Sequence, residues 1–226
     1  MERRQLLQGF AVALAFPGLA RADEVQSFKL SKAFAYLDKF LGLPAAMRTR
    51  FNVVYYAMRD RKPAPDLQGV IVEADGRRTP LQLDHDGRVV SMPTLGLLRS
   101  DAKLEAAAAP GVKLGLRLEL HPNVALSPHP DPAALAQSLA QANAAIATLA
   151  GAMSFAAPKL TAAIFVQAGS GQAILANGKI APLPLGAGRF AAGQPYFEPA
   201  ATPGAKALTL ARTPARISLS PHPAAS

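Results

Sequence analysis

The sequence predicts an α+β fold in which strands predominate, built from two pseudo-repeats that each place a helix before an antiparallel sheet or sandwich. Three observations lead to this prediction. Two segments carry apolar residues at helical spacing, many short segments alternate between apolar and polar residues, and one run of turn and strand residues recurs in the second half. The chain has 226 residues and no cysteine, so its fold must rest on an apolar core without disulfides.

The first half begins with a predicted helix over residues 28–46. Its apolar residues Leu30, Phe34, Leu37 and Leu41 recur at intervals of three and four. That spacing places them on one side of a helix, which predicts that the helix packs against the following sheet.

Strands follow this helix. Residues 51–58 are largely apolar on both alternating faces, which predicts a central strand covered on both sides. Residues 70–72 lead into Asp75-Gly76, a pair that favours a type I′ hairpin turn. Residues 112–120 alternate apolar with charged residues and glycine, as a half-buried strand does.

The second half repeats this order after a proline-rich linker at residues 121–130. Asp131 caps a predicted helix that starts at Pro132 and runs to residue 151 or 155. Further strands are predicted around residues 164–166, 173–175, 206–211 and 216–220.

The two halves also match in sequence. Residues Asp75–Leu83 (DGRRTPLQL) align with Asn177–Leu185 (NGKIAPLPL), 102 positions later. Hairpins converge on similar turn residues, but the agreement of order, spacing and the P-L-x-L run favours an internal duplication. The predicted organisation is a signal peptide, a first unit, a linker, a second unit and a tail: residues 1–22, 23–120, 121–130, 131–220 and 221–226.

The first 22 residues have the features of a signal peptide. Arg3 and Arg4 precede a short apolar stretch, and residues 20–22 (Ala-Arg-Ala) fit a small-x-small cleavage site. The paired arginines also resemble a twin-arginine signal, but Glu2 departs from that pattern, so both export routes stay open. The apolar stretch is shorter than the roughly 20 residues that cross a bilayer. We therefore expect a periplasmic or secreted protein that does not span the membrane.

Two segments, Phe28–Tyr36 (FKLSKAFAY) and Gly151–Leu160 (GAMSFAAPKL), are similar to a family of exported proteobacterial proteins of unknown function. This chain is richer in alanine and proline than that family. The resemblance implies export and the general architecture over most of the mature chain, and it assigns no activity and no site residue.

Asp84, His85 and Asp86 form the densest cluster of catalytic residue types. Two carboxylates beside an imidazole could bind a metal ion or orient a general base, which is the basis of a hydrolase or metal-dependent enzyme hypothesis. Consecutive residues at a strand end point in different directions, however, and the cluster runs into Gly87. A solvated turn is therefore the favoured interpretation.

Other motifs give little support to an enzyme. His121, His129 and His222 each precede proline in predicted linker or tail sequence, where no rigid element sets the spacing of a zinc site. Residues 169–171 (Gly-Ser-Gly) lack the spacing of a serine-hydrolase elbow and predict a hairpin turn. The sequence has no nucleotide-binding, dinucleotide-binding or HExxH motif. We therefore predict neither a metal nor a cofactor.

A basic and aromatic stretch is the predicted partner-binding surface. Arginine forks bind carboxylates and phosphates, and tyrosines add stacking surface. The formal net charge of +9 also favours anionic partners. The leading hypothesis is a non-enzymatic envelope protein that binds an unknown protein, a lipid or another anionic envelope component, and not nucleic acid. The predicted residues are Arg48, Arg50, Tyr55, Tyr56, Arg59, Arg61, Lys62, Arg77 and Arg78.

A third hypothesis is a carrier of a small apolar ligand held between helix and sheet. The aromatic residues Phe34, Tyr36, Phe40 and Phe165 are its candidates, although such residues more commonly form plain core.

Overall fold

The computed structural model describes residues 24–151, 157–188 and 191–221. The predicted signal peptide, His222 and most of the predicted tail lie outside these residues. Over the described residues the protein is α+β with strands predominating, which confirms the predicted fold class. No described helix is both long and apolar enough to cross a membrane.

The chain forms short helices in its first half and one long helix in its second. The helices are α1 (Leu30–Ala33), α2 (Leu37–Gly42), η1 (Ala45–Arg48), α3 (Leu95–Arg99) and α4 (Pro132–Ala150). The strands of the first half are β1 (Glu24–Lys29), β2 (Phe51–Arg59), β3 (Lys62–Pro63), β4 (Gly69–Val72), β5 (Arg78–Pro80), β6 (Lys103–Ala108) and β7 (Leu114–Pro122). Those of the second half are β8 (Ala162–Val166), β9 (Gly171–Leu175), β10 (Ile180–Pro182), β11 (Tyr196–Phe197), β12 (Ala205–Leu210) and β13 (Arg216–Ser220).

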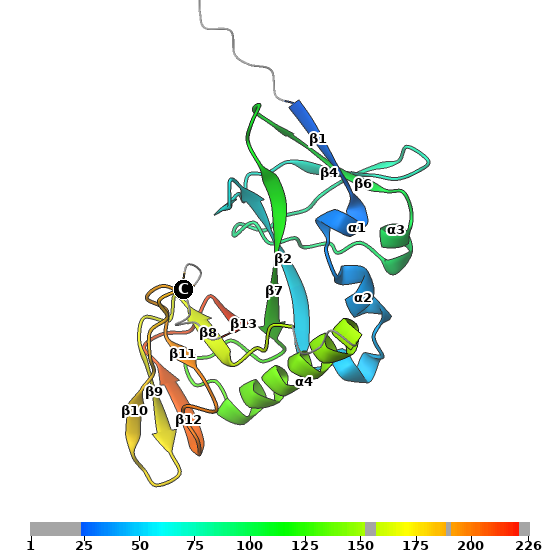
Figure 1. Cartoon of the computed structure of the whole chain (residues 1–226). Coiled ribbons are helices and arrows are strands. Elements are labelled where there is room, and N and C mark those ends of the chain that lie inside the picture. The colour runs from blue at the N-terminus through cyan, green and yellow to red at the C-terminus, as the bar shows by residue number, and fades with distance from the viewer. Residues whose placement is uncertain (1–23, 152–156, 189–190, 222–226) are drawn as a thin grey trace, which may run out of the picture.

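The strands form three antiparallel sheets. Two of them are small, with the orders β1-β6-β4-β5 and β10-β9-β12. The third has the order β11-β8-β13-β7-β2-β3, and its long pair β2–β7 runs from the first small sheet towards α4 (Figure 1). The halves meet inside this third sheet, because β13 of the second half pairs with β7 of the first. The sheet is therefore shared, and β7 extends into the first two residues of the predicted linker.

The predicted repeat is present in the strand pairing. Ile71 stands opposite Thr79 in the first half, and Ala173 stands opposite Ala181 in the second, 102 positions later in both strands. The neighbouring pair corresponds in strand order, since β6-β4-β5 matches β12-β9-β10, but Leu104 and Leu208, which stand opposite Ile71 and Ala173, lie 104 positions apart. The shared register shows that the likeness extends beyond the two turns to the strands around them.

The long pair β2–β7 has its own counterpart in β8–β13. Met58 is opposite Gly115 in the first pair, and Phe165 is opposite Ile217 in the second. Met58 of β2 and Phe165 of β8 thus lie 107 residues apart, and Gly115 of β7 and Ile217 of β13 lie 102 residues apart. Each half thus contributes one strand pair to the six-stranded sheet, and the two pairs are joined at its centre.

The predicted helix over residues 28–46 is wrong in two respects. Its first two residues belong to β1, which pairs with β6 along six positions. The rest is divided into α1, α2 and η1, and the break between the first two lies at Tyr36, whose φ of 69° is left-handed. Leu30, Phe34 and Leu37 are nevertheless all buried, as their spacing predicts.

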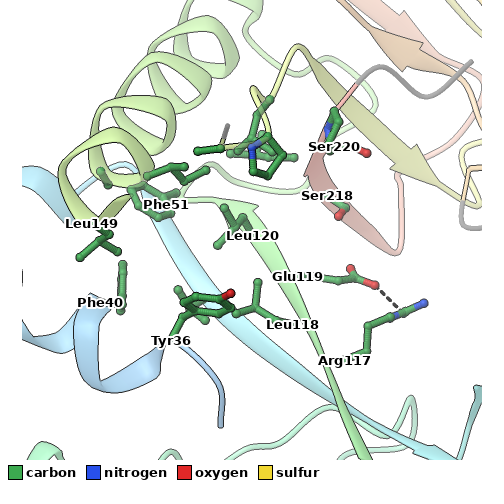
Figure 2. Close-up of a pocket in the computed structure, with 18 of the residues that line it drawn as sticks. Tyr36, Phe40, Phe51, Arg117, Leu118, Glu119, Leu120, Leu149, Ser218 and Ser220 are labelled. Atoms are coloured by element: carbon green, nitrogen blue, oxygen red, sulfur yellow. Dashed lines mark ion pairs between the residues drawn. The ribbon is translucent and has the colours of Figure 1, made fainter. Parts of the chain in front are cut away.

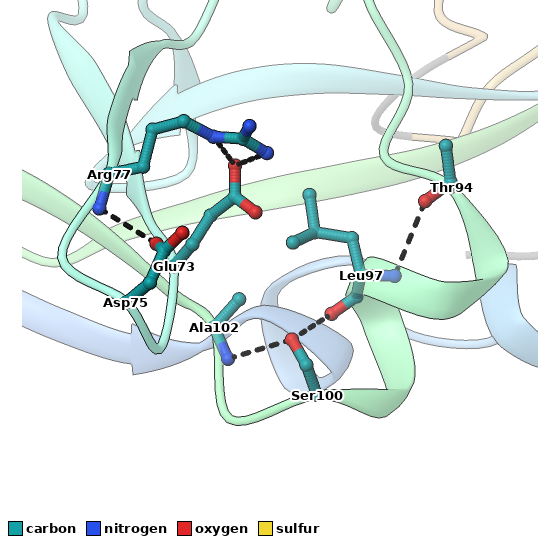
Figure 3. A network of polar contacts seen from close by, with 7 residues as sticks. All are labelled: Glu73, Asp75, Arg77, Thr94, Leu97, Ser100 and Ala102. Carbon is teal, nitrogen blue, oxygen red and sulfur yellow. Dashed lines mark hydrogen bonds and ion pairs between the residues drawn. The ribbon is translucent and has the colours of Figure 1, made fainter.

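Residues 93–109 carry no predicted element, yet they form α3 and β6. Thr94 caps α3 by accepting a hydrogen bond from the backbone N–H of Leu97 at 3.3 Å. At the other end the Ser100 hydroxyl donates to the Leu97 carbonyl at 2.8 Å and accepts from the Ala102 N–H at 3.2 Å (Figure 3). Alanine-rich β6 (KLEAAA) has low strand propensity, and its pairing with β1 and β4 overrides that propensity.

The hairpin predicted at Asp75-Gly76 forms, and so does its counterpart at Asn177-Gly178, but the predicted type I′ turn is not present. That turn needs positive φ at both central residues. The φ is positive at Gly76 (86°) and Gly178 (79°), whereas the preceding Asp75 and Asn177 have no positive φ. Each of these side chains instead accepts a hydrogen bond from the backbone N–H two residues on, at 3.0 Å in both turns. The first of these turns also carries the Arg77–Glu73 ion pair (Figure 3).

The predicted hairpin at residues 169–171 is wrong. The strands on either side, β8 and β9, belong to different sheets and do not pair with each other. Gly171 instead begins β9, where a Cβ atom would lie 2.8 Å from side-chain atoms of both Leu183 and Leu210. The glycine is thus required by close packing at the point where the chain changes sheets.

Candidate functional site

A cavity of about 750 Å³ lies where the two halves meet. Its walls come from α2, the C-terminal turns of α4, and strands β2, β7, β8 and β13 (Figure 2). Most of the lining is apolar, and six residues represent it: Phe40, Phe51, Leu118, Leu120, Leu149 and Leu219. The volume lies within the range of about 300–1,000 Å³ that is usual for small-molecule sites.

The cavity lies beside the junction of β7 and β13. β7 pairs with β2 along nine positions, but it pairs with β13 only where Leu120 faces Leu219. The cavity is also bordered by α2 and α4.

Two amide side chains hold α4 in place beside this space. The Gln141 side-chain oxygen accepts a hydrogen bond from the Arg50 N–H at 2.7 Å, and its nitrogen donates to the Ala46 carbonyl at 3.0 Å. Asn143 makes two hydrogen bonds of 2.8 Å with the backbone of Leu160. The helix is therefore tied to the first half by one residue and to the chain leading into β8 by the other.

Equivalent parts of the two repeats both line the cavity. Val53 of β2 and Leu160, which precedes β8, both line it and stand 107 positions apart, the offset that relates these strands. Leu118 of β7 and Ser220 of β13 do the same at the offset of 102. The cavity therefore belongs to the interface between the repeats and is not a feature of either half alone.

A largely buried ionic cluster forms one wall. The Glu119 carboxylate, with 11% of its side chain exposed, makes an ion pair with Arg117. It also lies 3.0 Å from His121 Nε2 and accepts a hydrogen bond from Arg216 Nε at 3.3 Å. Arg117 and Arg216 both lie over the Tyr56 ring, 5.5 Å and 5.1 Å from its centroid. Figure 2 shows Arg117 and Glu119 on the side of the cavity opposite Phe40 and Leu149.

The cluster keeps Glu119 ionised. Burial would raise the pKa of this carboxyl group, but the hydrogen bond with His121 and the charges of Arg117 and Arg216 outweigh burial and hold the pKa below its usual range. Burial also raises the pKa of Tyr56, against the opposing effect of Arg216, so this phenol stays protonated. Three of the lining residues are cationic (Lys39, Arg117 and Arg216) and one is anionic, which leaves an excess of positive charge at the cavity.

The lowered pKa of Glu119 predicts a pH dependence of stability. Because the folded state lowers this pKa below the ordinary value of 4.5, the ionised carboxylate stabilises the fold above that pH, and the stabilisation is lost as the pH falls through the lowered value. Urea unfolding of the wild type should therefore show a steeper loss of stability on acidification than unfolding of a Glu119→Gln variant. Equal slopes for the two proteins between about pH 5 and pH 3 would contradict this role.

The catalytic candidates Asp84, His85 and Asp86 form a turn. The Asp84 side chain accepts hydrogen bonds from the backbone N–H groups of Asp86 at 3.0 Å and Arg88 at 2.9 Å. The His85 side chain is 89% exposed and lies 3.6 Å from Asp86. Within the described ranges, no three His, Asp or Glu side chains come together as a metal-binding group.

The predicted partner-binding residues are not brought together. Tyr55 and Tyr56 are both buried, and the Tyr55 hydroxyl donates to the Ala35 carbonyl at 2.6 Å. The basic residues flank opposite ends of the nine-residue strand β2, with Arg48 and Arg50 at one end and Arg59, Arg61 and Lys62 at the other. The basic residues therefore lie near both ends of the strand and do not form one continuous patch.

Several of these arginines already have acidic partners. Arg59 pairs with Asp66 at 2.9 Å, and Arg78 pairs with Glu105 at 3.1 Å. Arg77 pairs with Glu73. These pairs satisfy the charges locally at the protein surface.

The aromatic ligand candidates divide into two groups. Tyr36 and Phe40 line the cavity, whereas Phe34 and Phe165 are fully buried in the two apolar cores. Phe34 packs edge-on against Tyr55, with ring centroids 5.0 Å apart.

The ionic cluster was not predicted from the sequence. Arg117, Glu119 and His121 alternate along one face of β7, a spacing that can be read in the sequence, but His121 was assigned to a linker, wrongly. The fourth member, Arg216, comes from the other half of the chain and reaches the cluster only because β13 lies beside β7.

Comparison of the chain with models of protein families, with curated proteins and with solved structures gave no match.

Proposed function

We propose that this protein is an exported binding protein that holds a small, largely apolar molecule in the cavity between its two halves. The observation that carries this proposal is the cavity of about 750 Å³, with apolar walls contributed by both repeats. Small-molecule sites are typically pockets of this size with mostly apolar walls and a few polar groups, and this cavity has both features.

The geometry favours this function over binding of a macromolecule through the basic stretch. The two tyrosines of that stretch are buried, and its arginines are separated by the length of β2. Two of the four aromatic residues expected for an apolar ligand site, by contrast, do line the cavity.

Binding of the neutral fluorescent dye N-phenyl-1-naphthylamine tests the proposal. We expect wild-type protein to bind the dye, and an Ala150→Trp variant to bind it about tenfold more weakly or not at all, because Ala150 lines the cavity and indole would fill part of it. The matched control is Ala147→Trp, an exposed position one turn earlier on α4, which should bind like the wild type.

A second filling variant, Ser218→Trp, enters the cavity from β13 and does not alter the helix. Agreement between the two filling variants would separate occupation of the cavity from damage to α4. If wild type, both filling variants and the control bind the dye alike, or if the wild type does not bind it, the cavity is not the binding site and the proposal is wrong.

A further inference from the structure

We infer that the ligand of this cavity is an anionic amphiphile, whose acidic head group is received by Arg216 beside Arg117 and whose apolar chain lies against α2 and α4. This inference rests on the proposed function, since it names the ligand class for the same cavity. It comes from how charge is distributed over the walls.

Arg216 keeps the capacity to bind a head group. Its hydrogen bond to Glu119 leaves from Nε, whereas a guanidinium has five N–H donors in a planar fork that matches a carboxylate or phosphate. The Tyr56 ring beneath it, 5.1 Å from the guanidinium carbon, supports the side chain without using these donors. About a quarter of the side chain is exposed, so a head group at the cavity can reach it.

The excess of cationic side chains in the lining favours an anionic ligand. Glu119 is already ionised and is surrounded by Arg117, Arg216 and His121, so it does not neutralise all the positive charge of the wall. Lys39 on α2 adds another cation to the lining. An acidic head group would complement this excess at low solvent exposure, whereas an ammonium group would be repelled.

Equivalent positions of the two halves do not carry the same charges, so the two sides of the cavity differ. The positions equivalent to Arg117 and Glu119 in the second half are Leu219 and Pro221, and the position equivalent to Arg216 in the first half is Leu114. The charges that the strands contribute, on Arg117, Glu119 and Arg216, thus lie together at one side of the cavity. An apolar chain with one charged end fits that asymmetry in a single orientation.

Displacement of the bound dye by ten-carbon ligands that differ only in the head group tests the inference. We expect decanoate to bind at least about tenfold more tightly than 1-decanol, since a charge-assisted hydrogen bond is worth about that factor or more. Decylammonium should bind most weakly. The advantage of decanoate over decanol should shrink as sodium chloride is added, a measurement that needs only the wild-type protein.

Arg216→Met should remove the preference for decanoate, so that decanoate and decanol bind the variant with similar affinity. The control is Arg212→Met, an exposed arginine outside the lining whose Nε donates to the Gln167 carbonyl at 2.6 Å, and it should leave both affinities unchanged.

The outcomes separate this inference from the proposed function. Equal affinity for decanoate and decanol in the wild type, or tighter binding of decylammonium, would overturn the inference while dye binding in the cavity still stands. A decanoate preference that survives both added salt and Arg216→Met would also overturn it. If the dye and all three ligands fail to bind, the proposed function falls as well.

Discussion

Leu104→Ala and Leu208→Ala should each lower the free energy of unfolding by about 2–4 kcal/mol, because each removes a buried leucine side chain and leaves a cavity in a packed core. The two residues occupy equivalent places in the repeats. Leu104 of β6 is opposite Ile71, and Leu208 of β12 is opposite Ala173, 102 positions after Ile71. Urea unfolding followed by circular dichroism measures both changes.

The same pair of variants tests how independent the two halves are. Leu104 belongs to the core around α1 and α3, and Leu208 belongs to the core beneath α4. Because the two cores are separate, the double variant should lose the sum of the single losses to within about 0.5 kcal/mol. Leu126→Ala, at a side chain that is half exposed, is the control and should change stability by about 0.5 kcal/mol or less. If Leu104→Ala or Leu208→Ala lowers the free energy of unfolding no more than Leu126→Ala does, the assignment of these leucines to the two cores is wrong.

Glu119→Gln should lower the free energy of unfolding by about 2–3 kcal/mol at neutral pH. The reason is that two guanidinium groups and an imidazole lose the carboxylate that they share, at a mostly buried place. The estimate lies below the usual cost of breaking a fully buried pair, because about a fifth of each arginine side chain is exposed. Urea unfolding at neutral pH measures it.

Glu105→Gln is the matched control for this change. Glu105 pairs with Arg78, an arginine whose side chain is 57% exposed, and such surface pairs contribute little. We expect a loss of about 0.5 kcal/mol or less. In addition, Arg216→Met should lower the free energy of unfolding less in the Glu119→Gln background than in the wild type, because the carboxylate that pairs with Arg216 is already absent. Equal losses for the two glutamates would show that the cluster is not a stabilising unit.

Local patterns predicted the elements that depend on neighbours in sequence. Alternation over residues 112–120 predicted β7, and Asp131 followed by Pro132 predicted the start of α4, where the Asp131 side chain accepts a hydrogen bond from the Ala133 N–H at 2.9 Å. Such signals succeed because a cap or an amphipathic face is decided within a few residues.

Elements that depend on distant pairing were missed or misread. β1 and β6 stabilise each other across more than 70 residues, and neither has a strong pattern of its own. The turn at residues 169–171 has the composition of a hairpin, but its flanking strands find partners in different sheets. Composition can specify a turn and still not specify which strands it joins.

For the candidate site, the parts could be predicted from local sequence: a repeated run of turn and strand residues, an apolar face on each part, and alternating charges along β7. The folded structure was needed to show that β13 pairs with β7, and that Arg216 from the second half completes the cluster around Glu119. The physical reason is that the spacing of side chains along a strand is a local property of the backbone, whereas the space between two strands depends on everything packed around them.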